Sequence, residues 1–250
     1  MRLEKDLKLF LQPTKYCNSN RKEITTIAHK ITNSYENKRE KAKALFYWVK
    51  ERIKFEFGYW GIKAFDVLQQ GKGMCTNKAN LLIAFLRAIN IPAGYGILEV
   101  NTKEFYRELM CPSFRKLVSP DTIHIYVGIF LYKQWLICDP SVDSELADAL
   151  KKKTPFAEMT GFDISKKDIK NMRGILTRKE FFPNIDKDLE KPPRHAKGIT
   201  IRILNSYLRF LREKKQTIRN LSAERIEKNF FNWLRKKSTY YFRFMKKISK

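Results

Sequence analysis

The sequence contains few of the residues that usually bind metals or carry redox chemistry. It has three histidines and four cysteines in 250 residues. The cysteines form no Cys-x-x-Cys pair; they are Cys17, Cys75, Cys111 and Cys138. Their spacing therefore supports neither a structural zinc site nor a dithiol redox motif. The sequence also lacks a glycine-rich phosphate loop, so it gives no sign of the common nucleotide-binding folds. We expect neither a cofactor nor a metal.

Long apolar runs are missing as well. No stretch approaches the roughly 18 apolar residues that a transmembrane helix requires. Residues 1–7 contain no apolar core of the length found in signal peptides. We therefore expect a soluble, cytoplasmic protein whose cysteines are mostly free thiols.

Acidic residues are scarce relative to basic ones. The chain has 51 lysines and arginines against 26 acidic residues, a net charge of +25. Residues 196–250 hold 16 of these basic residues and only three glutamates, a net charge of +13. Such a segment favours an acidic partner, which can be a protein surface, a nucleic acid or an anionic lipid.

Apolar residues are plentiful enough for a globular core. They make up 43% of the chain, and aromatic residues make up 13%. A chain of this length can bury one good core with a smaller appendage. Apolar periodicity predicts helices, then strands, then a polar and partly helical region followed by further helix. The predicted helices span 24–33, 37–53, 65–70 and about 75–91; the predicted strands span 93–100, 122–130 and 135–139; the polar region spans 151–178, and helix resumes near 200.

The most informative residue is Cys75, which follows a Gly-Lys-Gly-Met turn and begins an apolar helix. Pro92 prevents that helix from continuing. A helix N-terminus presents unpaired N–H groups and about half a positive charge, and both stabilise a thiolate. Cys75 is therefore placed as a nucleophile would be. The alternative is a buried cysteine with a purely structural role.

Two polar residues interrupt the β-rich region that follows. His124 lies inside one predicted strand, and Asp139 closes the next, just before Pro140. An imidazole in an apolar strand needs a hydrogen-bond partner. If the strands pair so that His124 faces Asp139, their Cβ atoms lie about 4.5–5.5 Å apart. That register leaves residues 131–132 as the connection, although a bulge or a looser turn would also serve. The alternative is a satisfied core histidine with a surface aspartate.

Several motifs occur together in an order that we recognise, and they span roughly residues 24–141. The sequence resembles the transglutaminase-like superfamily of papain-type cysteine enzymes. The motifs are KAKALFYWV (41–49), AFDVLQQGKGMC (64–75), LIAFLRAINIP (82–92), His124 in a strand, and WLICDP (135–140).

The resemblance implies an α+β fold with a papain-like or transglutaminase-like core. In that core the nucleophile begins a helix packed on an antiparallel sheet. Cys75 would be the nucleophile, His124 its acid–base partner and Asp139 the residue that orients the imidazole. No acidic cluster suggests the calcium sites of animal transglutaminases.

A triad of this kind forms an acyl-enzyme from an amide or thioester and passes the acyl group to an amine or to water. The developing oxyanion needs fixed donors, and the backbone N–H of Cys75 is the first candidate. Trp60, Tyr59 and Gln69 are candidates for the second donor, and the sequence does not choose among them.

The basic C-terminal segment mixes lysine and arginine with aromatic residues. This pattern suits a nucleic acid, an anionic membrane surface or an acidic protein partner. It also suits a helical extension that packs on the core and exposes a basic face. Nucleic acid is disfavoured because no fingerprint module is present. The predicted division is a transglutaminase-like catalytic domain over 1–180, a linker over 181–199 and a basic helical extension over 200–250.

The sequence is compatible with three functions. One is hydrolysis or transamidation of a glutamine or peptide amide. Another resembles the amide synthases of antibiotic assembly lines, whose acyl groups are held on acidic carrier proteins; the net charge fits that version. A non-catalytic interaction module that kept the fold is the third. The sequence does not indicate the oligomeric state.

Overall fold

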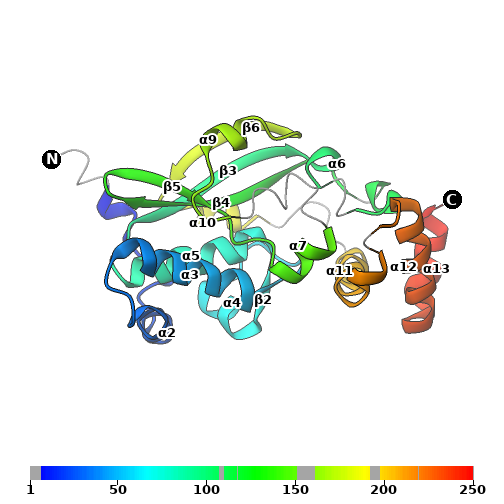
Figure 1. The fold of residues 1–250 in the computed structure, drawn as a ribbon, viewed down its shortest axis with the longest axis horizontal. Coiled ribbons are helices and arrows are strands. Elements are labelled where there is room, and N and C mark those ends of the chain that lie inside the picture. The colour runs from blue at the N-terminus through cyan, green and yellow to red at the C-terminus, as the bar shows by residue number, and fades with distance from the viewer. Residues whose placement is uncertain are drawn as a thin grey trace.

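The computed structural model describes residues 7–106, 110–116, 118–150, 161–191, 198–218 and 220–249. Its centre is a four-stranded antiparallel sheet with the strand order β5-β4-β3-β6. Helices α2 to α5 gather on one side of this sheet, and α11 to α13 lie together at one end of the molecule (Figure 1). The strands are β3 (Ala93–Asn101), β4 (Asp121–Leu131), β5 (Gln134–Cys138) and β6 (Ile175–Phe182).

Helix α5 (Cys75–Ala88) lies within the first hydrophobic cluster. This cluster consists mainly of buried apolar side chains of α2 to α5 and of strands β3, β4 and β5. Helix α5 packs against β3, β4 and three other helices, and every residue from Cys75 to Arg87 is buried. The neighbouring helices are α2 (Lys22–Thr32), α3 (Lys38–Arg52) and α4 (Ala64–Gln70). Residues 81–86 of this helix are all apolar and buried, and the sequence pattern predicted a buried helix from this run. The α+β fold class, with this helix packed on an antiparallel sheet, is confirmed.

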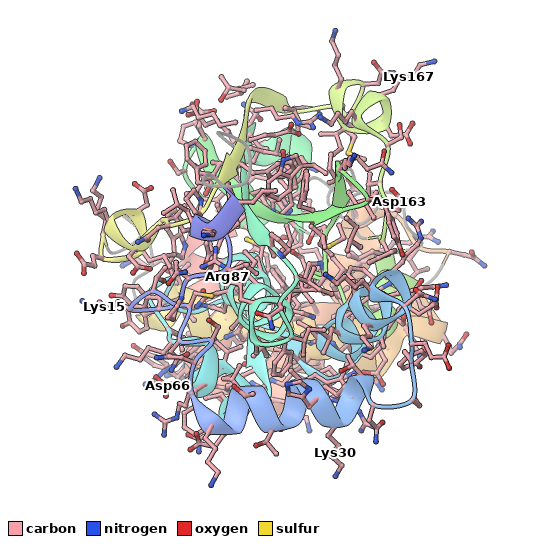
Figure 2. The ribbon with its side chains drawn as sticks, turned by 90° about the vertical axis from the view of Figure 1, so that its left-hand side faces the viewer. Lys15, Lys30, Asp66, Arg87, Asp163 and Lys167 are labelled. Carbon is pink, nitrogen blue, oxygen red and sulfur yellow. The ribbon has the colours of Figure 1, made fainter. Side chains whose placement is uncertain are left out.

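Arg87 joins the end of α5 to two distant parts of the chain. The side chain is only 3% exposed and lies in the interior, whereas Lys30 and Lys167 project outward at opposite ends of the view (Figure 2). Its guanidinium donates to the carbonyl oxygens of Ala93 at 2.8 Å, Gln12 at 2.5 Å and Pro183 at 2.6 Å. These bonds satisfy a buried cation that would otherwise be costly to desolvate.

A small parallel pair of strands leads to the start of α5. Strand β1 (Lys54–Phe55) pairs with β2 (Lys72–Gly73), and Phe55 lies opposite Gly73. The loop of residues 56–63 therefore begins beside the turn that precedes Cys75. Gly71 ends α4 with a φ of 64°, a left-handed conformation that glycine adopts without strain.

The hairpin of β4 and β5 corrects the predicted register by two residues. Val127 pairs with Cys138, so His124 does not lie directly opposite Asp139. The connection is Tyr132–Lys133, with φ values of 50° and 64°. Positive φ at both positions is characteristic of a type I′ turn, which matches the twist of the strands. A shift of two residues preserves the sheet face on which each side chain lies.

Strand β6 was not predicted. Residues 151–178 were expected to be polar and partly helical, and α9 (Lys166–Lys170) is indeed a helix. Residues 175–178, however, begin β6, which pairs with β3 at the sheet edge. Five of the eight residues of β6 are exposed, and none is fully buried. Its sequence therefore lacks the apolar alternation that identifies a half-buried strand. Residues 151–160 lie outside the described part of the chain.

The C-terminal helices share a second hydrophobic cluster with the sheet and the β3–β4 connection. Phe114 and Phe230 contact Tyr207 in edge-on geometry, with ring centroids 5.1 and 5.0 Å from it. The elements around this cluster include α6 (Thr102–Phe105), the 3₁₀ helix η2 (Pro112–Lys116), α7 (Ser144–Leu150), α11 (Gly198–Ile218), α12 (Ala223–Lys237) and α13 (Thr239–Ser249).

The predicted domain division stays a prediction. Within the segment predicted as a linker, α10 (Asp186–Leu189) is a short helix. Ile185 and Leu189 are buried in the first hydrophobic cluster. Across the described ranges, no helix has both the length and the apolar character needed to cross a bilayer.

Candidate active site

Cys75 is the first residue of α5, and its side chain is nearly buried at 4% exposure. Met74 precedes the helix in an extended conformation, and its N–H donates to Oδ1 of Asn77 at 3.1 Å. The N–H groups of a first helical turn have no partner inside the helix. Cys75 therefore lies where backbone N–H groups and the helix dipole favour negative charge.

His124 and Asp139 form a buried hydrogen-bonded pair. Nε2 of the imidazole is 2.5 Å from Oδ2 of the carboxylate, and neither side chain is exposed. The other carboxylate oxygen accepts hydrogen bonds from the backbone N–H of Ser141 at 2.8 Å and from the Ser141 hydroxyl. These three contacts fix the orientation of Asp139, and Asp139 in turn fixes the imidazole. Ser141 was not singled out from the sequence.

Cys75 extends the His124–Asp139 pair to three residues, because its side chain hydrogen-bonds to His124. Burial by itself lowers the pKa of His124. The negative charges of Asp139 and Cys75, together with hydrogen bonds to both, outweigh that effect and raise the pKa from 6.5 to about 10. The structure therefore brings together sulfur, imidazole and carboxylate, and it favours a charged imidazolium at neutral pH. Their catalytic roles remain predictions.

Tyr106 adds an aromatic hydroxyl to the site. Its oxygen is 3.5 Å from Nδ1 of His124, the ring nitrogen that Asp139 does not hold. Burial raises the pKa of Tyr106 well above its usual value, so the hydroxyl stays neutral. The neighbouring Phe105 ring lies 5.4 Å from the imidazole ring, centroid to centroid. Nothing in the sequence distinguished Tyr106 from the other aromatic residues.

The candidates for the second oxyanion donor occupy different places. The side chain of Tyr59 is 63% exposed, and that of Trp60 packs against the first hydrophobic cluster. Gln69 lies in α4 with an exposed side chain. The carbonyl groups of Tyr59 and Trp60 accept hydrogen bonds from Nδ2 of Asn77, at 3.1 and 2.9 Å. The choice of the second donor stays open.

Asn77 is a residue that the sequence analysis missed. It bridges the turn before Cys75 and the loop of residues 56–63, which fixes the approach to the nucleophile from both sides. A signal was present in the sequence, because the polar run Thr-Asn-Lys-Ala-Asn (76–80) opens an otherwise apolar helix. Polar side chains that must be buried are usually hydrogen-bonded.

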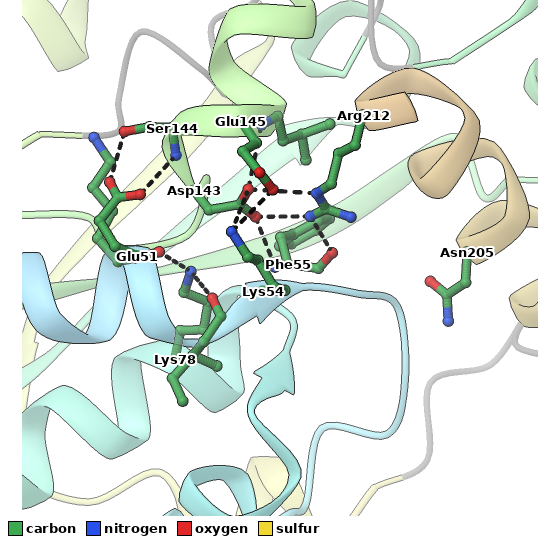
Figure 3. A network of polar contacts seen from close by, with 12 residues as sticks. Glu51, Lys54, Phe55, Lys78, Asp143, Ser144, Glu145, Asn205 and Arg212 are labelled. Carbon is green, nitrogen blue, oxygen red and sulfur yellow. Dashed lines mark hydrogen bonds and ion pairs between the residues drawn. The ribbon is translucent and has the colours of Figure 1, made fainter. Parts of the chain in front are cut away.

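Lys78 is a second polar residue buried one turn after the nucleophile. Its ammonium donates to the carbonyl oxygens of Lys50 at 2.9 Å and Ile53 at 2.5 Å, at the C-terminal end of α3 (Figure 3). Burial lowers the pKa of Lys78 to about 7, although the carboxylates of Asp143 and Asp139 act in the opposite direction. The lysine therefore caps the C-terminal end of α3. It is also a buried titratable group three residues after Cys75.

The other three cysteines differ from Cys75. Burial raises the pKa values of Cys17, Cys111 and Cys138. Cys138 is fully buried and belongs to the first hydrophobic cluster. Among the residues that the structure describes, no group of three or more His, Cys, Asp or Glu side chains could hold a metal ion.

Comparison with known proteins relates part of the chain to a known family. Residues 25–140 match the family described as the transglutaminase-like superfamily. No curated protein matches the chain. A crystal structure described as a "putative cysteine protease" from Cytophaga hutchinsonii is similar, with a TM-score of 0.44 and 21% sequence identity; the match covers 70% of this chain and 53% of that one. The chain thus spans about half the length of that protein. The segment that matches the transglutaminase-like superfamily carries Cys75, His124 and Asp139.

Proposed function

We propose that this protein is a cysteine acyltransferase or hydrolase that forms a covalent acyl-enzyme on Cys75. One observation carries the proposal: Cys75 begins a buried helix and hydrogen-bonds to His124, whose other side is held by Asp139 at 2.5 Å. A nucleophile, a base and a residue that orients the base are the three parts of covalent acyl transfer.

The first half of the reaction is acylation. The Cys75 thiolate attacks the carbonyl carbon of an amide or thioester, a C–S bond forms, and the carbonyl electron pair moves to oxygen. When the tetrahedral intermediate collapses, the bond to the leaving nitrogen or sulfur breaks. His124 gives its proton to that leaving group. Because Asp139 holds Nε2 of the imidazole, Nδ1 is the nitrogen that carries this proton.

Deacylation returns the site to its starting state. Neutral His124 accepts a proton from an incoming amine or water as that group attacks the Cys75 thioester. Collapse of the second intermediate expels the thiolate and leaves an imidazolium beside it. Asp139 stabilises this charged ring, and the backbone N–H at the start of α5 receives the developing oxyanion.

The charge of the C-terminal helices supports a macromolecular donor with an acidic surface. Eight basic side chains of α12 and α13 are exposed: Arg225, Lys228, Arg235, Lys236, Lys237, Arg243, Lys246 and Lys247. A surface of one sign attracts a partner of the opposite sign and speeds its encounter. Met245 is buried and Phe244 packs against the second hydrophobic cluster. Because these apolar side chains are already covered, an acidic protein or peptide fits this surface better than insertion into a membrane.

Intact-mass analysis tests the proposal directly. The protein is incubated with a glutamine peptide and a labelled amine, and separately with an acyl-loaded carrier protein. We expect one donor to leave an acyl adduct on Cys75 that the amine or water then removes. Cys75→Ala should form no adduct, and His124→Ala should form it at least 100-fold more slowly.

Two outcomes would count against the proposal. The first is the absence of an adduct with every donor. The second is equal reactivity of all four thiols toward iodoacetamide. Either result would favour a transglutaminase-like interaction module that has kept the fold without the chemistry.

A further inference from the structure

The first helix of the C-terminal extension holds the loop that leads to the active site. Asn205 of α11 makes two hydrogen bonds to the backbone of Phe57. Its Oδ1 accepts from the Phe57 N–H at 2.8 Å, and its Nδ2 donates to the Phe57 carbonyl at 2.9 Å. One side-chain amide thus satisfies both backbone groups of one residue, as a neighbouring strand would. The two residues are 148 positions apart in the sequence.

A second contact from the same helix lies seven residues further on. Arg212 donates to the carbonyl oxygen of Phe55 at 2.9 Å and pairs with the carboxylate of Asp143 at 2.7 Å (Figure 3). Residues seven apart share one face of a helix, so Asn205 and Arg212 both hydrogen-bond to the backbone of residues 55–57. Asp143 is fully buried and also accepts the N–H of Phe55 at 3.1 Å.

The electrostatics of this contact agree with a permanent pair. Burial acts to raise the pKa of Asp143, but the hydrogen bond and the charge of Arg212 outweigh it and lower the pKa. A buried carboxylate that stays charged needs its cation, because an unpaired charge in the interior is strongly destabilising. Arg212 is therefore held in place by Asp143, four residues after the triad member Asp139.

Residues 55–57, which Arg212 and Asn205 bind, are also connected to the start of α5. Phe55 pairs with Gly73 in the small parallel sheet, and the N–H of Glu56 donates to the Gly73 carbonyl at 3.2 Å, two residues before Cys75. Further along, the carbonyl groups of Tyr59 and Trp60 accept from Asn77 in the first turn of α5. Residues 55–60 are thus fixed by α11 at one end and by the nucleophile helix at the other.

We propose that Asn205 is a positioning residue that sets residues 57–60 beside the nucleophile, so that α11 is part of the catalytic unit. The proposal rests on the acyl-transfer function proposed above. Tyr59 and Trp60 are bonded to Asn77, two residues after Cys75, and so lie beside the first turn of the helix that carries the nucleophile. Loss of the Asn205 amide removes both hydrogen bonds to Phe57 and allows residues 57–60 to move relative to Cys75. A misplacement of about 1 Å in such a site can lower a rate by about 100-fold.

Two thiol probes separate positioning from general damage. Iodoacetamide alkylates sulfur in a single displacement that develops no oxyanion, so its rate reports the Cys75–His124 pair. p-Nitrophenyl acetate acylates sulfur through a tetrahedral oxyanion and releases p-nitrophenolate, so its burst also reports the surrounding donors. In Asn205→Ala we expect alkylation of Cys75 to stay within about twofold of the wild type, and acylation to slow about tenfold or more.

Two further variants complete the experiment. Asn232→Ala removes an exposed asparagine from α12 of the same extension and should leave both rates unchanged. Asn205→Asp keeps the acceptor for the Phe57 N–H and loses the donor, so its acylation rate should fall between those of the wild type and Asn205→Ala. It also decides the outcome if Asn205→Ala fails to fold.

The positioning role of Asn205 is refuted if folded Asn205→Ala is acylated at the wild-type rate. It is also refuted if the alkylation and acylation rates of this variant fall by the same factor. A wild-type Cys75 that reacts selectively with neither probe would instead contradict the proposed function itself. The two failures are therefore distinguishable.

Discussion

Nε2 of His124 and Oδ2 of Asp139 are 2.5 Å apart, although the two residues are not paired on their strands. The hairpin register places Cys138 opposite Val127, and Asp139 reaches the imidazole from just beyond the end of β5. The carboxylate keeps this orientation because Ser141 binds its other oxygen. The pair thus depends on the residues that follow the strand, and not on direct cross-strand pairing.

Cys75 should be the most reactive thiol of the protein. We expect iodoacetamide to alkylate Cys75 near neutral pH at least tenfold faster than Cys17, Cys111 or Cys138, because burial raises the pKa values of those three. His124→Ala should slow the alkylation of Cys75 by about tenfold or more. Peptide mapping by mass spectrometry measures each site. The matched control is His29→Ala, which removes an exposed imidazole from α2 and should change nothing.

The stability of the fold should depend on the protonation of His124. Its folded pKa of about 10 lies above the unfolded value of 6.5. Between these values the folded state holds a proton that the unfolded state has released, so stability falls as pH rises. The contribution is complete below pH 6.5 and is lost as pH rises through about 10. Urea unfolding of the wild type and His124→Gln should show their difference in unfolding free energy shrinking over this interval. A constant difference would show that the imidazole is not held as a cation.

Lys78 should change the pH dependence of stability in the opposite direction from His124. Its folded pKa of about 7 lies below the ordinary value of 10.5. Between these values the unfolded state binds the additional proton, so the lysine favours the folded state more as pH rises. Relative to Lys78→Met, the wild type should gain stability from pH 7 to 10, as measured by urea unfolding at several pH values. Lys30→Met, on the exposed face of α2, is the control and should show no such trend. Parallel curves for the wild type and Lys78→Met would contradict the prediction.

The β4–β5 turn should be open to stabilisation. Tyr132 and Lys133 both have positive φ, which residues other than glycine and asparagine adopt at a cost. Tyr132→Asn and Lys133→Gly should each raise the free energy of unfolding by about 0.5–1 kcal/mol. Thermal unfolding measures the change. Gln134→Gly, one residue later in β5, should instead destabilise the protein, since glycine weakens a strand. A loss of stability in both turn variants would refute the turn assignment.

Much of the fold followed from local patterns in the sequence. The apolar periodicity of α5 and the β-rich runs of β4 and β5 predicted these elements, because a buried helix or strand repeats its apolar residues at a set period. Cys75 stood out because it began the most apolar helix. His124 and Asp139 stood out because polar side chains are unusual in buried strands. These signals are local, and a single sequence contains them.

Other features required the tertiary structure. The hairpin register depends on positive φ at Tyr132 and Lys133, which neither residue type suggests. Strand β6 is a mostly exposed edge strand without apolar alternation. Its position follows from pairing with β3.

The sequence by itself determined which side chains could perform covalent chemistry and which helix and strands carry them. The tertiary structure decided how they meet. Ser141 orients Asp139, Asn77 joins the loop to the nucleophile helix, and Asn205 binds Phe57 from 148 positions away. Periodicity reports only which face of an element is buried. Contacts between distant elements arise from the packing of the whole chain, and no local pattern encodes them.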